Sequence, residues 1–193
     1  MYMVKNNSFV IMGCKHCGKS THGRAIAEKL GLDFFDVDSV IERLAGVPVR
    51  QFYAEKGAAD FMQTEEFACK RIIDYTNERN KDVIVSTGGG ICDNAPALDQ
   101  LRVCKAFVFL RLNINDMVKR IMEEVEEPEP GKFTNLPAFV AVSKPKTLKE
   151  AKNILTEKLT ARNATYEKIA DIIVDIDDAP IDENTEIIFR AIH

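Results

Sequence analysis

Short runs of apolar residues alternate along the chain with longer stretches in which apolar residues recur every three or four positions. The short runs end at glycine or polar residues, as buried parallel strands do, and the longer stretches have the period of helices packed on one side. The short runs predict strands at 8–12, 33–37, 82–86, 105–111 and 171–176. The longer stretches predict helices at 19–30, 39–45, 58–79, 114–124, 148–170 and 183–193.

This alternation determines the fold class that we expect. Strands joined by helices pair in parallel, and the helices then cover both faces of the sheet. We therefore predict an α/β fold of three layers, α/β/α, with a five-stranded parallel sheet in the middle. The chain of 193 residues contains no internal repeat and no long linker. We expect a single domain over 1–193.

The overall composition is that of a soluble globular enzyme, with 46% hydrophobic and 29% charged residues. A formal net charge of −4 argues against a protein that coats nucleic acid. It is compatible with a local basic site that binds phosphates. No apolar run approaches the roughly 20 residues that span a bilayer. Residues 1–7 lack the features of a signal peptide. We expect a cytoplasmic protein whose scattered cysteines, Cys69, Cys92 and Cys104 among them, are reduced.

The segment between the first predicted strand and the first predicted helix reads GCKHCGKST. It matches G-x-x-x-x-G-K-[ST] at a strand-to-helix junction, the pattern of a phosphate-binding loop, or P-loop. Glycines in such a loop let backbone N–H groups point at phosphates. Lys19 supplies positive charge for the β- and γ-phosphates of a nucleoside triphosphate, and Ser20 offers a hydroxyl to Mg²⁺. The predicted nucleotide-binding residues are Gly13, Cys14, Lys15, His16, Cys17, Gly18, Lys19, Ser20 and Thr21.

Two cysteines inside the P-loop allow other interpretations. Cys14 and Cys17 form a C-x-x-C pair, which can be a redox dithiol, and together with His16 they could bind zinc. No second pair of ligands occurs at zinc-finger spacing, and these residues occupy the variable positions of the loop. A helix N-terminus favours the thiolate form, so we expect both cysteines to oxidise easily.

Residues 123–145 interrupt the periodic pattern with four prolines, one glycine and a cluster of acids at their start. An aperiodic segment of this length is usually an active-site lid or a disordered insertion. Because this segment lies between two clearly periodic helices of a nucleotide-binding pattern, we predict a mobile lid at about 123–146.

Three further motifs follow the P-loop in order. Asp36 and Asp38 stand two residues apart at the end of the second predicted strand. Three glycines at 88–90 follow the third predicted strand. Arg162 begins an R-x-x-x-Y-x-x-x-A-D stretch that leads into the last predicted strand. With the P-loop, these motifs make nearly the whole chain resemble the shikimate kinase family. From the residues alone, the aspartates could cap the helix beginning near Ser39, and the glycines could provide a positive φ.

The resemblance implies that the γ-phosphate of ATP passes to a hydroxyl of a small carboxylated polyol. Asp36 would hold hydrated Mg²⁺ together with Ser20. Asp38 would bind the acceptor hydroxyls and take the proton of the attacking one. With Lys19 on the phosphates, catalysis would consist mainly of positioning and charge neutralisation.

The resemblance also implies a pocket for the acceptor and a contact for adenine. Gly88, Gly89 and Gly90 would line the acceptor pocket, and Arg162 would bind the carboxylate through its planar guanidinium. Arg120 would pack against adenine. From the residues alone, both arginines could equally be exposed on helix surfaces.

Two departures from the family pattern concern the acceptor. The family reads G-E-x-x-F-R-x-x-E before its long helix, and Met62 stands here in place of an arginine that also binds the carboxylate. Losing one charge-assisted hydrogen bond costs about 1.5–3 kcal/mol. The family lid carries R-P-L-L, and Leu136 stands here in place of its arginine. An arginine that stabilises phosphoryl transfer in this way can raise the rate by about 10³–10⁵. Candidates to replace that charge are Lys132, Lys144 and Lys146.

The leading hypothesis is a kinase that converts shikimate to shikimate 3-phosphate, with ATP and Mg²⁺ as cofactors. One alternative is a kinase of a different small hydroxy acid or sugar acid. Another is a non-catalytic nucleotide-binding relative, which Met62 and Leu136 favour and Asp36, Asp38 and Arg162 oppose. We expect a monomer with a small-molecule substrate and neither nucleic acid nor membrane as partner.

Overall fold

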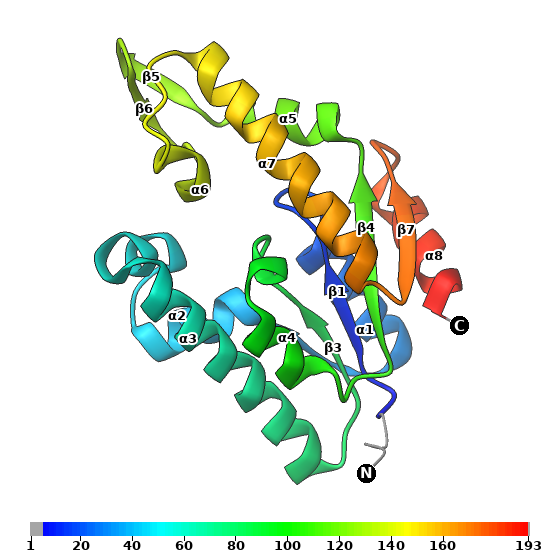
Figure 1. Ribbon diagram of the computed structural model, residues 1–193. Helices are drawn as coiled ribbons and strands as arrows, with labels where there is room; N and C mark the ends of the chain where they lie inside the picture. The colour runs from blue at the N-terminus through cyan, green and yellow to red at the C-terminus, as the bar shows by residue number, and fades with distance from the viewer. Residues whose placement is uncertain (1–5, 193) are drawn as a thin grey trace.

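The computed structural model describes residues 6–192, and Figure 1 shows a twisted sheet with helices on both faces. Five strands form this sheet in the order β2-β3-β1-β4-β7, and every neighbouring pair is parallel. The predicted fold class is therefore confirmed. The strands are β1 (Phe9–Met12), β2 (Asp33–Asp36), β3 (Val83–Ser86), β4 (Ala106–Leu112) and β7 (Ile172–Ile176).

The strands agree with the predicted ranges to within one residue at each end. Every residue of β1 and β3 is buried, because these central strands carry helices on both faces. Helices fill the connections between them. They are α1 (Lys19–Leu30), α2 (Val37–Ala45), α3 (Val49–Arg79), α4 (Ala95–Leu101), α5 (Ile114–Glu123), α6 (Ala138–Ala141), α7 (Leu148–Ile169) and α8 (Ile181–Ile192).

Two helical regions differ from the sequence-based expectation. α3 begins at Val49 rather than at residue 58 and is interrupted at Gly57, whose φ of 82° and ψ of 179° are not helical. Sequence reasoning also missed α4 and the 3-10 turn η1 (Ile91–Asp93) that precedes it. These elements are too short to display a helical period. The last predicted residue of the C-terminal helix, position 193, lies outside the described residues.

Sequence reasoning assigned no secondary structure to residues 125–145, whereas the structure contains an antiparallel hairpin and a short helix there. Strands β5 (Glu126–Glu129) and β6 (Lys132–Thr134) pair around a turn at Gly131, where φ is 74°. The buried side chains of Leu136 and Val140 then anchor the segment that includes α6. Local turn chemistry and two apolar anchors therefore organise a stretch that lacks a longer period.

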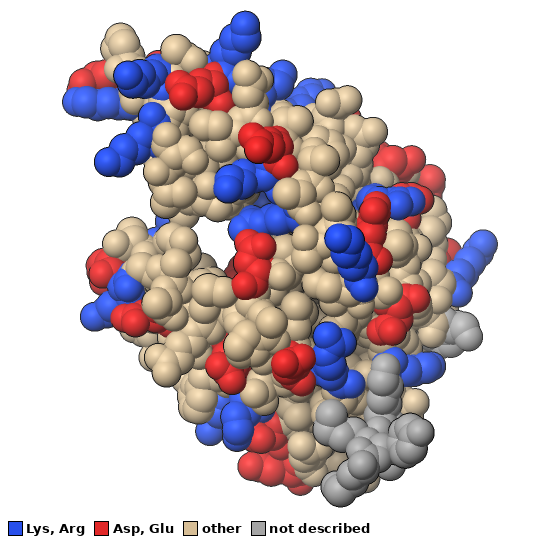
Figure 2. Space-filling view, in the orientation of Figure 1, with Lys and Arg blue, Asp and Glu red and all other residues tan. Residues whose placement is uncertain are grey.

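This hairpin and α6 face α2 and α3 across the carboxyl ends of the central strands (Figure 1). A space-filling view shows an opening between the two parts of the molecule, with acidic and basic side chains at its rim (Figure 2). Arg50 of α3 bridges them, since its guanidinium donates to Asn135 Oδ1 at 3.1 Å and to the Leu136 carbonyl at 3.5 Å. Among residues 6–192, no helix has both the length and the apolar character needed to cross a bilayer.

Candidate active site

The P-loop runs from the end of β1 to the start of α1 and curls around the side chain of Lys19. Gly18 has a φ of 77° directly before the helix, a conformation that glycine adopts without strain. A Cβ atom on Gly13 would lie 2.7 Å from the Leu110 carbonyl oxygen, so this position has no room for a side chain. Lys19 Nζ donates to the Cys14 carbonyl at 2.9 Å. The ammonium group is therefore held inside the loop.

Three oxygen-bearing side chains meet beside the first turn of α1. Ser20 Oγ hydrogen-bonds to Asp36 Oδ2 and lies 3.2 Å from Ser86 Oγ, at the end of β3. The second oxygen of Asp36 accepts from the Ser39 N–H at 3.2 Å, so Asp36 also caps α2. Asp36 therefore caps α2 and also contacts Ser20, its predicted partner in holding Mg²⁺. Hydroxyl and carboxylate oxygens are the ligands that Mg²⁺ prefers, together with phosphates and water.

The described residues contain no group of three or more His, Cys, Asp or Glu side chains placed to hold a metal ion. A zinc site at Cys14, Cys17 and His16 therefore finds no support in the structure. Ser20 and Asp36 nevertheless suit a hydrated Mg²⁺, because an ion that keeps several waters needs only one or two protein ligands.

Two carboxyl groups flank the start of the glycine run, the half-buried Asp38 and the buried Glu65. Asp38 lies in the first turn of α2, and burial and the nearby Asp36 raise its pKa to about 6. Glu65 of α3 accepts a hydrogen bond from Asn94 Nδ2 at 2.8 Å. Burial raises the pKa of Glu65 to about 7, although the Asn94 hydrogen bond opposes this. Carboxyl groups that titrate this close to neutrality are suited to accept a proton during catalysis.

The three glycines have no positive φ, which rules out the interpretation that they merely permit a turn. Each one closely approaches a different part of the site. A Cβ atom would lie 2.9 Å from Asp38 Oδ1 at Gly88, 2.9 Å from the Lys15 backbone nitrogen at Gly89, and 3.2 Å from Arg162 Nη2 at Gly90. The glycine run therefore packs between the P-loop and the predicted acceptor residues.

Arg162 projects from α7 toward this glycine run. Its Nε and Nη2 atoms donate to Asp93 Oδ2 at 3.2 and 2.8 Å, and its guanidinium carbon lies 4.1 Å from the centroid of the Phe139 ring in α6. Burial alone would lower the pKa of Arg162, but hydrogen bonding to Asp93 and the charge of Asp93 raise it. Sequence reasoning did not select Asp93 or Phe139, because neither belongs to a recognisable motif.

Arg120 lies on the α5 side of the P-loop. Its Nη1 donates to the His16 carbonyl at 2.9 Å, and its Nη2 forms an ion pair with Asp178 after β7. Lys15 and His16 both face Glu124, at 3.2 and 3.3 Å. The predicted nucleotide-binding residues of α5 and of the P-loop are thus brought together, with Ser20 and Thr21 exposed on the first turn of α1.

The expectation that Cys14 oxidises easily is wrong. Its Sγ atom is buried and donates to Asn163 Oδ1 at 3.3 Å. Burial, with a smaller contribution from Cys17, raises the pKa of Cys14 to about 12. The loss of solvation outweighs the helix N-terminus, so Cys14 stays a thiol. Cys17 is also buried, and none of the five cysteines forms a disulfide.

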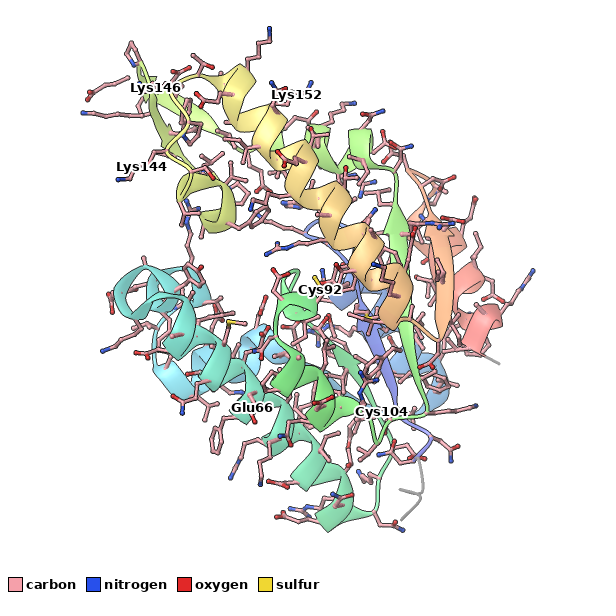
Figure 3. The ribbon with its side chains drawn as sticks, in the orientation of Figure 1. Glu66, Cys92, Cys104, Lys144, Lys146 and Lys152 are labelled. Atoms are coloured by element: carbon pink, nitrogen blue, oxygen red, sulfur yellow. The ribbon has the colours of Figure 1, made fainter. Side chains whose placement is uncertain are left out.

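The structure does not direct the lid lysines toward the P-loop. Lys132 forms an ion pair with Glu129 at 2.6 Å. Lys144 and Lys146 are exposed on the outer edge of the 123–146 segment (Figure 3). Leu136 is a buried residue of the 123–146 segment itself. The half-buried Met62 lies on α3, where its carbonyl accepts from Asn94 Nδ2 at 2.8 Å. None of these three lysines therefore takes the place of the family arginine that Leu136 replaces.

A parallel sheet in this order, with a P-loop after β1 and a serine–aspartate pair beside it, defines a P-loop kinase. The shikimate kinase family model matches residues 15–193. The shikimate kinase of Bacillus cytotoxicus is 32% identical over 184 residues, covering 95% of this chain and 96% of its own. The chain therefore belongs to the shikimate kinase family.

Solved structures of the family agree with this assignment. The shikimate kinase of Aquifex aeolicus is 26% identical, with a TM-score of 0.67 over 95% of each chain. A shikimate kinase from Acinetobacter baumannii, solved in complex with shikimate, superposes with a TM-score of 0.76. It covers 97% of this chain and 93% of its own and is 21% identical, a level that shows the fold alone.

Proposed function

We propose that this chain transfers the γ-phosphate of ATP to a hydroxyl of shikimate, giving shikimate 3-phosphate. The observation that carries the proposal is one continuous set of contacts. Lys19 lies inside the P-loop, Gly89 packs against that loop, and the adjacent Gly88 and Gly90 pack against Asp38 and Arg162. Phosphate-binding and acceptor-binding groups are therefore neighbours, as direct transfer requires.

The residues of the chain would divide the reaction as follows. The P-loop N–H groups and Lys19 would hold the phosphates. Ser20 and Asp36 would hold Mg²⁺, which would supply positive charge to neutralise the triphosphate. Asp38 orients the acceptor hydroxyl and takes its proton. A bond forms between the acceptor oxygen and the γ-phosphorus as the bond to the β–γ bridging oxygen breaks. Arg162 positions the acceptor through its carboxylate.

The segment at 123–146 acts in this proposal as a mobile lid on a single kinase domain. Two contacts support this role: Arg50 reaches Asn135 and Leu136 from α3, and Phe139 lies over the guanidinium of Arg162. A lid closed through these contacts would exclude water from the γ-phosphate. We further propose that the protein works in the cytoplasm as a monomer.

A second candidate function is phosphorylation of a different small hydroxy acid or sugar acid. Met62 favours it, because the acceptor carboxylate would find one arginine instead of two. The pairing of Arg162 with Asp93 at 2.8 Å favours it as well, since this arginine is already engaged.

Consumption of ATP, measured with shikimate and with a panel of other hydroxy acids and sugar acids, tests the proposal. We expect shikimate to be the preferred acceptor and Lys19→Ala to abolish turnover while the protein stays folded. Faster turnover of another acceptor would support the second candidate. Turnover by folded Lys19→Ala equal to that of the wild type would refute the P-loop mechanism.

A further inference from the structure

The guanidinium of Arg162 already has a carboxylate partner within the chain. Asp93 Oδ2 accepts from both Nε and Nη2, at 3.2 and 2.8 Å. The Gly89 carbonyl lies 3.5 Å from Nη1, and Phe139 covers the guanidinium at 4.1 Å. The Arg162 side chain is only 16% exposed, so this arginine meets few groups besides these. An incoming carboxylate would have to share or displace Asp93.

The surrounding charges also disfavour a second carboxylate. Asp38 and Glu65 approach Gly88 from α2 and α3, since a Cβ atom there would lie 2.9 Å from Asp38 Oδ1 and 3.2 Å from Glu65 Oε1. Asp93 belongs to η1, between the glycine run and α4. Acidic side chains from α2, α3 and η1 therefore line the same glycine run that Arg162 approaches.

We propose that Asp93 is a specificity-determining residue, whose carboxylate competes with the acceptor carboxylate for Arg162 and so weakens carboxylated acceptors relative to neutral polyols. The proposal rests on the proposed function, which assigns Arg162 to the acceptor. Met62 strengthens the effect, because no second arginine compensates for the charge of Asp93. The side chain of Asp93 is 55% exposed, so an incoming acceptor can reach it without unfolding the pocket.

Equilibrium binding of shikimate and of its uncharged methyl ester to wild type and Asp93→Asn tests the proposal. Asparagine keeps the shape of the side chain and removes its charge. We expect Asp93→Asn to bind shikimate about ten-fold more tightly, equivalent to about 1.4 kcal/mol, and to leave the affinity for the ester nearly unchanged. In steady-state kinetics of shikimate phosphorylation, Asp93→Asn should lower the KM for shikimate by a similar factor and leave kcat unchanged.

Asp175→Asn is the matched control. Asp175 forms a similar two-bond pair with Arg111, at 2.6 and 2.8 Å, on β7 outside the site. This variant should bind both compounds as the wild type does. Unchanged or weaker shikimate binding by Asp93→Asn, or equal tightening for acid and ester, would overturn the proposal. A wild type that binds shikimate without phosphorylating it would refute the proposed function but leave this binding comparison intact.

Discussion

Gly89→Ala probes the junction between the glycine run and the P-loop. The new methyl carbon would lie 2.9 Å from the Lys15 backbone nitrogen and 3.3 Å from the Lys15 Cα. A relaxed contact of this kind needs about 3.5 Å. The obstacle is backbone, which cannot rotate aside as a side chain can. The P-loop would therefore have to move away from the glycine run by roughly half an ångström.

The cost follows from the packing. Overpacking of this kind costs about 1–3 kcal/mol. Because the strain is relieved by moving the loop that holds the phosphates, we expect it to appear in nucleotide binding. ATP should then bind between about five-fold and about 150-fold more weakly. Because Gly89 has no positive φ, alanine adds no backbone strain of its own.

Gly90→Ala, one residue along the chain, provides the control. There the new methyl would lie 3.2 Å from Arg162 Nη2, the end of a flexible side chain. Calorimetric titration with ATP should show the defect in Gly89→Ala, while Gly90→Ala should keep its ATP affinity and change the KM for the acceptor. Wild-type ATP affinity in Gly89→Ala, or the same defect in both variants, would refute the assignment of these glycines to two different neighbours.

Three further predictions can be tested, two by substitution and one by hydrogen exchange. Met62→Arg restores the family residue and should lower the KM for shikimate by about ten-fold, measured by steady-state kinetics. Glu65→Gln should raise the free energy of unfolding by about 3 kcal/mol at pH 8 and by little at pH 4.5, measured by urea denaturation. Residues 123–145 should exchange their amide hydrogens quickly in the free protein and slowly once nucleotide and acceptor are both bound.

The sign of the Glu65 effect follows from its raised pKa. The folded protein holds a proton on Glu65 up to about pH 7, whereas the ordinary pKa of glutamate is 4.5. Above pH 7 the buried charge destabilises the wild type, and this penalty disappears as the pH falls from 7 to 4.5. A stability difference between Glu65→Gln and wild type that does not vary with pH would contradict this reasoning.

The other two predictions have their own controls. Gln63→Arg adds the same charge at the neighbouring exposed position of α3 and should leave the KM for shikimate unchanged. An equal effect of both arginines would show that Met62→Arg acts only through overall charge. Equally slow exchange of residues 123–145 in the free and bound protein would contradict a mobile lid.

The layered fold and the P-loop could be predicted from the sequence because both depend on local patterns. A short apolar run becomes a buried strand wherever helices cover it, and all five strands lie within one residue of their predicted ends. The P-loop could be recognised because Gly13, Gly18 and Lys19 are close in sequence and act together. The hairpin at 126–134 and helix α4 escaped prediction because elements this short contain no full period.

Only the tertiary structure decided which side chains meet in the pocket. Asp93 and Arg162 are 69 residues apart along the chain, and no local pattern pairs them. The thiol character of Cys14 likewise depends on Asn163 and on burial, which outweigh the helix N-terminus that the sequence displays. Local sequence therefore determined the phosphate site, because the P-loop is a single continuous segment. The charge balance around the acceptor comes from α2, α3, η1 and α7, and only the packing of these distant segments decides it.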